Sequence, residues 1–135
     1  MVTLWDLKSQ KEIQTLEGFG NSVGHVHFSP DGKNLACASE DGSVSIWDVA
    51  TWKRMHSIKD HSSSEVWNIS YSPDGRLLAS GGEDGEIHFR DAKNGRTLGR
   101  MNNSGSSSRQ AWFSPNGKWV ITTSSYGEVL VWDFQ

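Results

Sequence analysis

The side chains best placed for metal chemistry are His25 and His27, which stand two residues apart in the stretch 23–28. Residues i and i+2 of a β-strand point to the same face, so the two imidazoles would lie together and could bind a metal ion with a third ligand. No Cys, Asp or Glu stands beside them at ligand spacing. We therefore predict no metal site and no cofactor.

A second candidate centre is His61, which follows Asp60 and precedes a run of serines. Such neighbours could suggest a nucleophile and its base, but the sequence has no nucleophile elbow and no oxyanion signature. Adjacent residues also cannot supply the geometry that a hydrolase needs. The favoured role of His61 is structural, as a loop-fixing histidine bonded to Asp84.

Aspartates that precede glycine could be mistaken for paired catalytic carboxylates. Four such pairs occur, with the aspartate at positions 31, 41, 74 and 84. They recur because the turns recur, since Gly accepts a positive φ and Asp tolerates one. We assign them no catalytic role, and we predict that the chain is not an enzyme.

The elements that would position these residues are clearest in the stretch 28–48, where each of two apolar runs follows an Asp-Gly pair. The run 35–38 is apolar on both faces, as expected of a strand covered by protein on both sides. In the next run Val44 and Ile46 lie on one face, with Ser43, Ser45 and Trp47 on the other. The stretch predicts strand, turn, strand, turn, strand, with no helical period.

The same pattern returns with a period of about 42 residues, which marks a repeat architecture. The Ser-Pro-Asp-Gly of 29–32 recurs at 72–75 and, as Ser-Pro-Asn-Gly, at 114–117, at spacings of 43 and 42. The pair Trp47-Asp48 recurs as Trp-Asp at positions 5–6 and 132–133 and as Arg-Asp at 90–91. We predict about thirteen short strands and no helix, with 102–108, rich in Ser, Asn and Gly, as an exposed, mobile loop.

Composition excludes several classes of partner. The 135 residues carry a net charge of −3, a pI of about 5.9 and no basic run, which argues against nucleic acid or an anionic membrane. No apolar run approaches the roughly 20 residues that span a bilayer, and the N-terminus does not read as a signal peptide. The single cysteine, Cys37, favours a reduced, buried thiol in a cytoplasmic protein, with a nuclear location left open.

The repeated motif, Phe-Ser-Pro-Asp-Gly followed by Leu-Ala, Asp-Gly and Ile-Trp-Asp, resembles the WD-repeat β-propeller family over essentially the whole chain. The resemblance implies an all-β fold of blades, each a four-stranded antiparallel sheet. About three blades fit in this chain, as a partial propeller or half-ring. The single segment 1–135 would comprise a partial repeat (1–22), two repeats (23–65 and 66–108) and a third (109–135) that lacks its last strand.

Family blades often share a hydrogen-bonded set of His, Ser or Thr, Asp and Trp, and the resemblance implies structural roles for the residues that match it. No unit carries the full set, because Phe19, Cys37, Arg90 and Tyr126 replace members of it. Since the other copies carry Trp at the position of Arg90, the pattern predicts that Arg90→Trp is tolerated or stabilising. The matching residues are His61, Ser80, Asp84, Asp41, Trp47, Thr122 and Trp132.

The family also implies where a partner would bind. Trp67 occupies a column filled by Gly24 and Arg109 in the other units, and family residues at this column face the rim that holds partner peptides. The rim residues just before the turn are Glu40, Glu83 and Ser125. A large aromatic beside acids and an Arg has the composition of a binding hot spot. The alternative is that Trp67 packs against the neighbouring blade.

The function expected from these features is a non-catalytic protein–protein interaction scaffold that binds a protein or peptide. Three blades leave two faces uncovered, so the chain would belong to a longer propeller or close a ring by self-association. A homodimer would complete six blades, with the strand at 12–16 of one copy completing the third unit of the other. A second reading is a purely structural assembly module with no separate ligand.

Overall fold

The structure of the chain, a computed structural model, describes residues 1–62, 65–102 and 108–134, without the side chains of Ser108 and Arg109. The described residues form thirteen strands and no helix, which confirms the predicted all-β class. Nothing in this part of the chain is a helix long and apolar enough to cross a membrane. The predicted loop 102–108 lies outside the described residues, except for its two ends.

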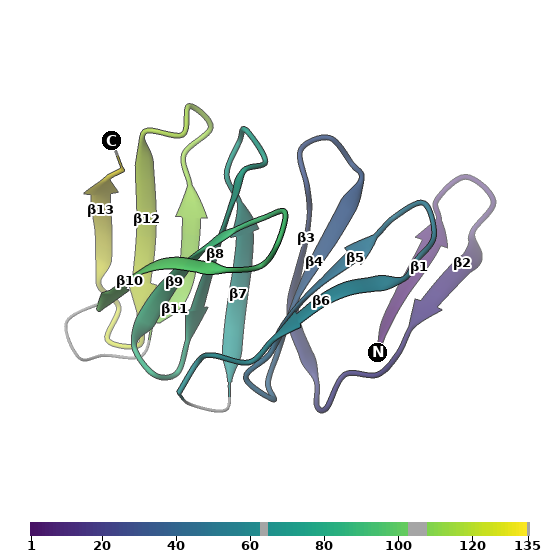
Figure 1. Ribbon diagram of the computed structural model, residues 1–135, viewed down its shortest axis with the longest axis horizontal. Helices are drawn as coiled ribbons and strands as arrows, with labels where there is room; N and C mark the ends of the chain where they lie inside the picture. The colour runs from purple at the N-terminus through teal and green to yellow at the C-terminus, as the bar shows by residue number, and fades with distance from the viewer. Residues whose placement is uncertain (63–64, 103–107, 135) are drawn as a thin grey trace.

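The strands form an N-terminal hairpin and three antiparallel sheets (Figure 1). The hairpin pairs β1 (Val2–Asp6) with β2 (Lys11–Leu16). The first sheet contains β3 (Val23–Phe28), β4 (Asn34–Ser39), β5 (Val44–Asp48) and β6 (Arg54–Ile58). The second contains β7 (Val66–Tyr71), β8 (Leu77–Gly82), β9 (Glu86–Asp91) and β10 (Thr97–Asn102). The third contains β11 (Ser108–Phe113), β12 (Trp119–Ser124) and β13 (Val129–Asp133).

The sheets have the predicted strand order, with small differences at strand ends. β2 begins at Lys11, one residue before the strand predicted at 12–16, and β11 begins at Ser108. Their ladders extend into polar residues: Lys11 pairs with Asp6, and Ser108 pairs with Ser124. A purely apolar pattern therefore underestimates these strands.

The turn between the first two strands of each sheet explains the recurring Ser-Pro-Asp-Gly motif. In the first sheet Ser29 Oγ donates to Asp31 Oδ1 over 2.6 Å, and the Lys33 N–H donates to the same oxygen over 3.0 Å. The third sheet repeats this arrangement with Asn116 in place of the aspartate. Gly32 has a φ of 70°, a conformation that L side chains rarely adopt. The motif therefore fixes the hairpin turn.

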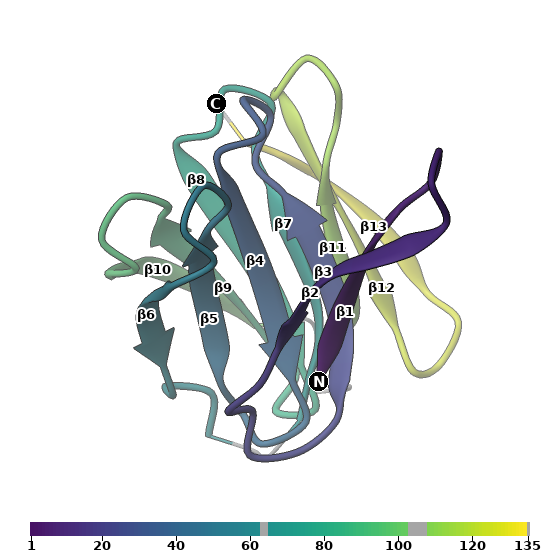
Figure 2. The same cartoon turned by 90° about the vertical axis from the view of Figure 1, so that its right-hand side faces the viewer.

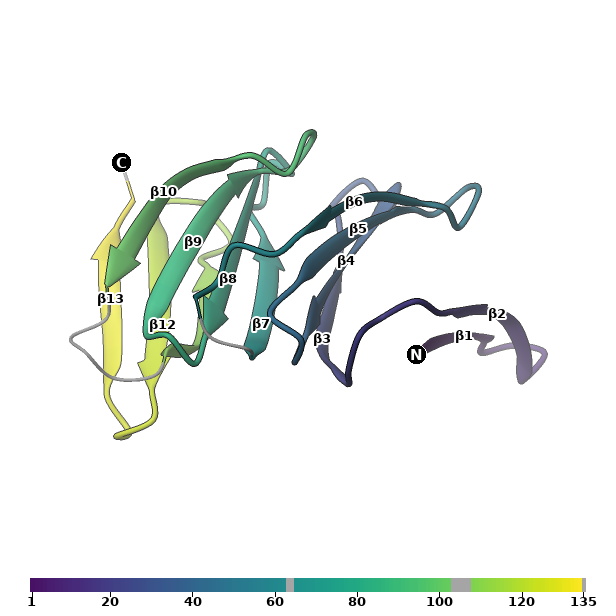
Figure 3. The same ribbon diagram turned by 60° about the horizontal axis from the view of Figure 1, so that its bottom comes forward.

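The three sheets stand beside one another as an arc, with the N-terminal hairpin at one end and β13 at the other (Figure 3). The first strands of the sheets are neighbours, since β3 packs beside β7 and β7 beside β11. Apolar clusters fill the two seams between sheets, and a third cluster lies between the hairpin and the first sheet. Each sheet thus obtains its core from its neighbours.

Candidate functional site

Trp67 lies at the start of β7, where the first and second sheets meet, and it is half-buried. A hollow of about 200 Å³ opens beside it, lined by Gly24, Glu40, Glu65, Val66 and Trp67. An added Cβ at Gly24 would lie 3.7 Å from the carbonyl oxygens of Val66 and Trp67, so the two inner strands run close together here. The hollow is therefore part of the seam between these sheets.

Backbone hydrogen bonds hold the two acidic residues of the hollow in place. The Glu40 N–H donates to the carbonyl of Ser22 over 2.9 Å, and the carbonyl of Glu65 accepts from the Glu83 N–H over 3.0 Å. Both Glu side chains are half-buried, and the ion pairs found among the described residues involve other acids. One tryptophan and two glutamates thus line the hollow.

The structure brings only part of the predicted rim set to this hollow. Trp67 and Glu40 line it, whereas Glu83 and Ser125 are exposed residues that do not. The side chain of Arg109 lies outside the described residues. Glu65 was missed by the sequence prediction, because it stands in the polar stretch before β7 and no repeated motif marks it.

The predicted structural set of the second sheet surrounds His61, just before β7. His61 Nδ1 donates to the Asp84 carboxylate, 3.0 Å from Oδ2, and its Nε2 accepts from Ser80 Oγ over 2.9 Å. The Ser62 N–H also donates to Asp84, over 3.0 Å. These bonds tie the loop before β7 to β8 and to the turn that follows it.

These contacts follow the Ser–His–Asp order of a catalytic triad, but the site is closed. Ser80 is 0% exposed, and its Oγ also accepts a hydrogen bond from the Arg90 guanidinium. Burial lowers the pKa of His61 to about 4, with His88 adding to the effect, so the ring is neutral at pH 7. The serine is closed to solvent, and we call this buried Ser–His–Asp trio the clasp.

Arg90 extends the clasp where the other repeats carry Trp. It is fully buried, and its guanidinium donates to Ser80 and forms an ion pair with Asp60. Thr97 Oγ1 also donates to Asp60. Burial by itself raises the pKa of Asp60, but hydrogen bonds from Thr97 and Arg90 and the Arg90 charge hold that pKa well below its usual range. One buried network therefore joins the loop before β7 to β8, β9 and β10.

His61, Asp84 and His88 are the one group of described residues whose ligand atoms are close enough to share a metal ion, within 4.8 Å. However, the two imidazole rings are stacked with centroids 3.8 Å apart and planes 12° from parallel. A nitrogen lone pair lies in the plane of its ring, so two stacked rings cannot direct lone pairs at one ion. The rings of His61 and His88 are therefore packed against each other and are not directed at a shared ion.

His25 and His27, the other pair weighed for metal binding, connect the first two sheets. His27 Nδ1 accepts from the Tyr71 N–H over 2.9 Å, and His25 Nδ1 lies 3.0 Å from the carbonyl oxygen of Ile69. Both partners belong to β7. These rings therefore join neighbouring inner strands.

In the first and third sheets other residues occupy most of the positions that correspond to His61, Ser80, Asp84 and Arg90. Asp41 accepts from the N–H groups of Gly20 and Ser43, while Trp47 Nε1 donates to Ser45 Oγ over 3.0 Å. Phe19, which replaces the histidine, lies with its ring 5.6 Å from that of Trp47. In the third sheet Trp132 Nε1 donates to Thr122 Oγ1 over 2.9 Å.

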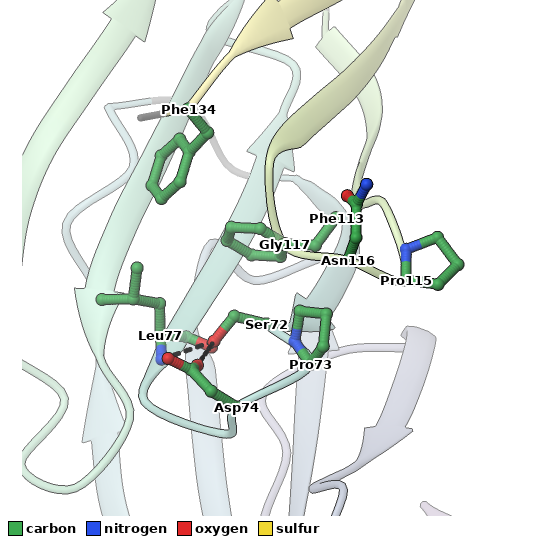
Figure 4. A pocket seen from close by; sticks show the side chains of 9 residues that line it. All are labelled: Ser72, Pro73, Asp74, Leu77, Phe113, Pro115, Asn116, Gly117 and Phe134. Atoms are coloured by element: carbon green, nitrogen blue, oxygen red, sulfur yellow. Dashed lines mark hydrogen bonds between the residues drawn. The ribbon is translucent and has the colours of Figure 1, made fainter.

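A larger hollow of about 310 Å³ lies at the opposite end of β7, between the second and third sheets (Figure 4). Its walls are two Ser-Pro turns, Leu77 and the rings of Phe113 and Phe134. The carboxylate of Asp74, which lines it, accepts from Ser72 Oγ over 2.6 Å and from the Arg76 N–H over 3.0 Å. This hollow is a gap between two turns, and the polar groups of each turn form hydrogen bonds within that turn.

Comparison with known proteins gives consistent results. The family model described as WD domain, G-beta repeat matches residues 10–48, 52–91 and 101–133. Retinoblastoma-binding-like protein E of Dictyostelium discoideum is 36% identical over 58 residues, which are 43% of this chain and 11% of that protein. The target of rapamycin complex subunit wat1 of Schizosaccharomyces pombe is 46% identical over 50 residues, which are 36% of this chain and 16% of that protein.

A solved structure extends the similarity to nearly the whole fold. A chain of the crystal structure of the mitotic checkpoint complex superposes with a TM-score of 0.84 at 27% identity, over 92% of this chain and 40% of that one. The chain thus spans less than a fifth of the two curated relatives and two fifths of the structural neighbour.

Proposed function

Because this chain belongs to the WD domain, G-beta repeat family, we propose that it is a non-catalytic protein-interaction scaffold whose partner binds at the hollow beside Trp67. The observation that carries the proposal is the hollow itself, in which a half-buried Trp stands beside Glu40 and Glu65. Tryptophan is enriched among the few residues that dominate interface energies. The two carboxylates would favour a partner segment that carries positive charge.

Two further points support a binding role over a catalytic one. The Ser–His–Asp trio is buried and held by Arg90, so it has a structural use. One relative is named as a complex subunit, and the structural neighbour was solved within a complex. The proposal includes a cytoplasmic location, which the lone buried Cys37 supports, because a protein exposed to oxidising conditions more often pairs its cysteines.

A second candidate function is a structural assembly module without a separate ligand. The uncovered outer face of the third sheet favours it, since Val129 and Val131 are 63% and 62% exposed. In either case the ring needs further blades, from a longer chain or from a second copy.

Selection of peptides separates the two candidates. A random-peptide library is panned against the immobilised chain, and the affinity of enriched peptides is measured by calorimetry for the wild type and for Trp67→Ala. We expect enrichment, and a loss of about 30-fold in affinity for Trp67→Ala, which corresponds to about 2 kcal/mol. The melting temperature should stay nearly unchanged.

Trp119→Ala is the matched control, because Trp119 is also partly exposed, at 42%, but lies on the third sheet. It should bind the selected peptides as the wild type does. No enriched peptide would favour the assembly module, whereas a large drop in melting temperature with binding intact would show that Trp67 stabilises the packing of the two sheets and does not bind the partner.

A further inference from the structure

The outer face of the third sheet repeats positions that are buried in the other two sheets. Val44 and Ile46 of β5 are 0% exposed, because the second sheet covers them. Their equivalents in β9 are also buried, under the third sheet. The equivalents in β13 are Val129 and Val131, at 63% and 62% exposure. The third sheet therefore ends in a stacking face without its neighbour.

The other end of the arc carries the complementary face, and it is only partly covered. Ile69 and Tyr71 of β7 pack into the first seam at 0% and 4% exposure. Their equivalents in β3, Val26 and Phe28, are 40% and 49% exposed. With parts of β1 and β2 they line an apolar hollow of about 390 Å³.

The N-terminal hairpin stands where the outer half of another sheet would be. Figure 2 views this end, with β1 and β2 in front of the first sheet. In β1 Val2 pairs with Leu16, and Leu4 pairs with Gln14. The third and fourth strands of the first sheet pair in the same manner, with an equal irregularity just before the Trp of the third strand. β2 therefore corresponds to the fourth strand of a sheet, and β1 corresponds to the third strand of that same sheet.

β1 and β13 are close equivalents in sequence. β1 reads Val-Thr-Leu-Trp-Asp and β13 reads Val-Leu-Val-Trp-Asp. Val2 and Leu4, which pack against the first sheet, occupy the columns of Val129 and Val131. β13 pairs only with β12 in the described chain and so has one free edge. Such an edge can pair with a further strand.

We propose that β1 is a built-in stand-in for β13 of a second copy, and that it occupies β2 and the hollow of the first sheet until that strand replaces it. The exchange breaks one antiparallel ladder and forms an equivalent one, so the backbone hydrogen bonds nearly balance. The gain is burial of the outer face of the third sheet on the uncovered face of the first. The occupant that we propose is a second copy, because one copy carries both faces of the inner seams together with a β13 whose sequence matches that of β1.

Two reciprocal exchanges give a closed ring of six sheets, in which each third sheet receives β2 of the other copy as its fourth strand. A head-to-tail contact that closes forms a finite assembly. The inference rests on the ring included in the proposed function, but it does not involve the hollow beside Trp67. The two can therefore fail separately.

Cross-linking tests the exchange in the full chain. In the unexchanged hairpin residue 14 faces residue 4, whereas after exchange it faces residue 131 of the other copy. Gln14→Cys and Val131→Cys copies are mixed, allowed to equilibrate and oxidised. We expect a covalent dimer of two 15.0 kDa chains. Background from Cys37 is low, since that thiol is 0% exposed and burial raises its pKa to about 12.

The matched control replaces Val131→Cys by Leu130→Cys, which lies on the opposite face because strand side chains alternate. We expect at least a tenfold lower yield of dimer from this pair. Equal yields, or no dimer from either pair while Leu4→Cys/Gln14→Cys cross-links within one chain, would overturn the exchange.

Deletion of residues 1–6 tests the stand-in directly. Without β1 nothing competes for β2, so the dimer should form faster and at a concentration at least tenfold lower than for the whole chain, by light scattering after gel filtration. Deletion of residues 1–17 also removes β2 and should abolish the dimer. A monomer at every concentration, or an open-ended ladder of species, from the 1–6 deletion would overturn the inference. Peptide binding at Trp67 with no exchange would leave the proposed function standing.

Discussion

Arg90 stands at a position where the other repeats carry Trp, and it forms different contacts there. Trp47 and Trp132 each donate one indole hydrogen bond within their own sheet. Arg90 instead forms an ion pair with Asp60 in the loop before β7, while it also donates to Ser80. The ion pair argues against the sequence-based prediction that Trp is tolerated here, because that prediction did not include the half-buried Asp60.

We expect Arg90→Trp to lower the free energy of unfolding by about 2–3 kcal/mol, since hydrogen bonds to charged groups are lost and Asp60 stays half-buried. Urea denaturation measures this loss. The double variant Asp60→Asn/Arg90→Trp should recover part of it, because the unpaired carboxylate is gone. A single variant at least as stable as the wild type would show that the ion pair contributes nothing.

At the scale of elements, His61 fastens the loop before β7 to β8, and this fastening depends on a neutral ring. Burial lowers the pKa of His61 from an ordinary value of 6.5 to about 4. As the pH falls the unfolded chain therefore takes up the proton first. The contribution of the neutral His61 to the free energy of unfolding is therefore complete above about pH 6.5. It is lost as the pH falls toward 4, by up to about 3 kcal/mol.

Urea denaturation at intervals between pH 7 and pH 4 checks this prediction. His61→Gln keeps a hydrogen-bonding side chain but cannot titrate, so its free energy of unfolding should decline less over this range. Asp84 has a pKa below its usual range, because hydrogen bonds and the His61 charge outweigh the effect of burial, so its contribution is lost only at lower pH. A wild-type free energy that is constant from pH 7 to pH 4 would contradict the assignment.

The strands were predictable from sequence because each is encoded locally, by alternation and by turns that need glycine. The contacts between loops were not. Gly82 stands where the other sheets carry Ser39 and Ser124, and an added Cβ there would lie 2.8 Å from His61 Nδ1 and 2.9 Å from the Glu65 carbonyl. Only the folded loop reveals that this glycine makes room for the clasp. Glu65 escaped prediction for the same reason, since its place depends on how the loop folds back.

At the scale of the molecule, the same kind of interface between sheets occurs at both inner seams of the arc. The exposed faces at the two ends of the arc carry the two sides of that interface. In a repeat protein stability is approximately a sum of the repeats and their nearest-neighbour interfaces. The second sheet has a neighbour on each side, whereas the third has one. Equivalent residues should therefore contribute very different energies along the chain.

Substitutions at Ile46, Phe89 and Val131, which occupy equivalent positions in the three sheets, test this difference. Ile46→Ala should lower the free energy of unfolding by about 3 kcal/mol and Phe89→Ala by about 4 kcal/mol, because both side chains are buried in seams. Val131→Ala should change it by less than about 0.5 kcal/mol in the monomer, since that side chain is 62% exposed. Denaturation at protein concentrations low enough to keep the chain monomeric makes the comparison. A Val131→Ala loss as large as that of Ile46→Ala would mean that the outer face of the third sheet is already covered within a single copy, and the open arc would be wrong.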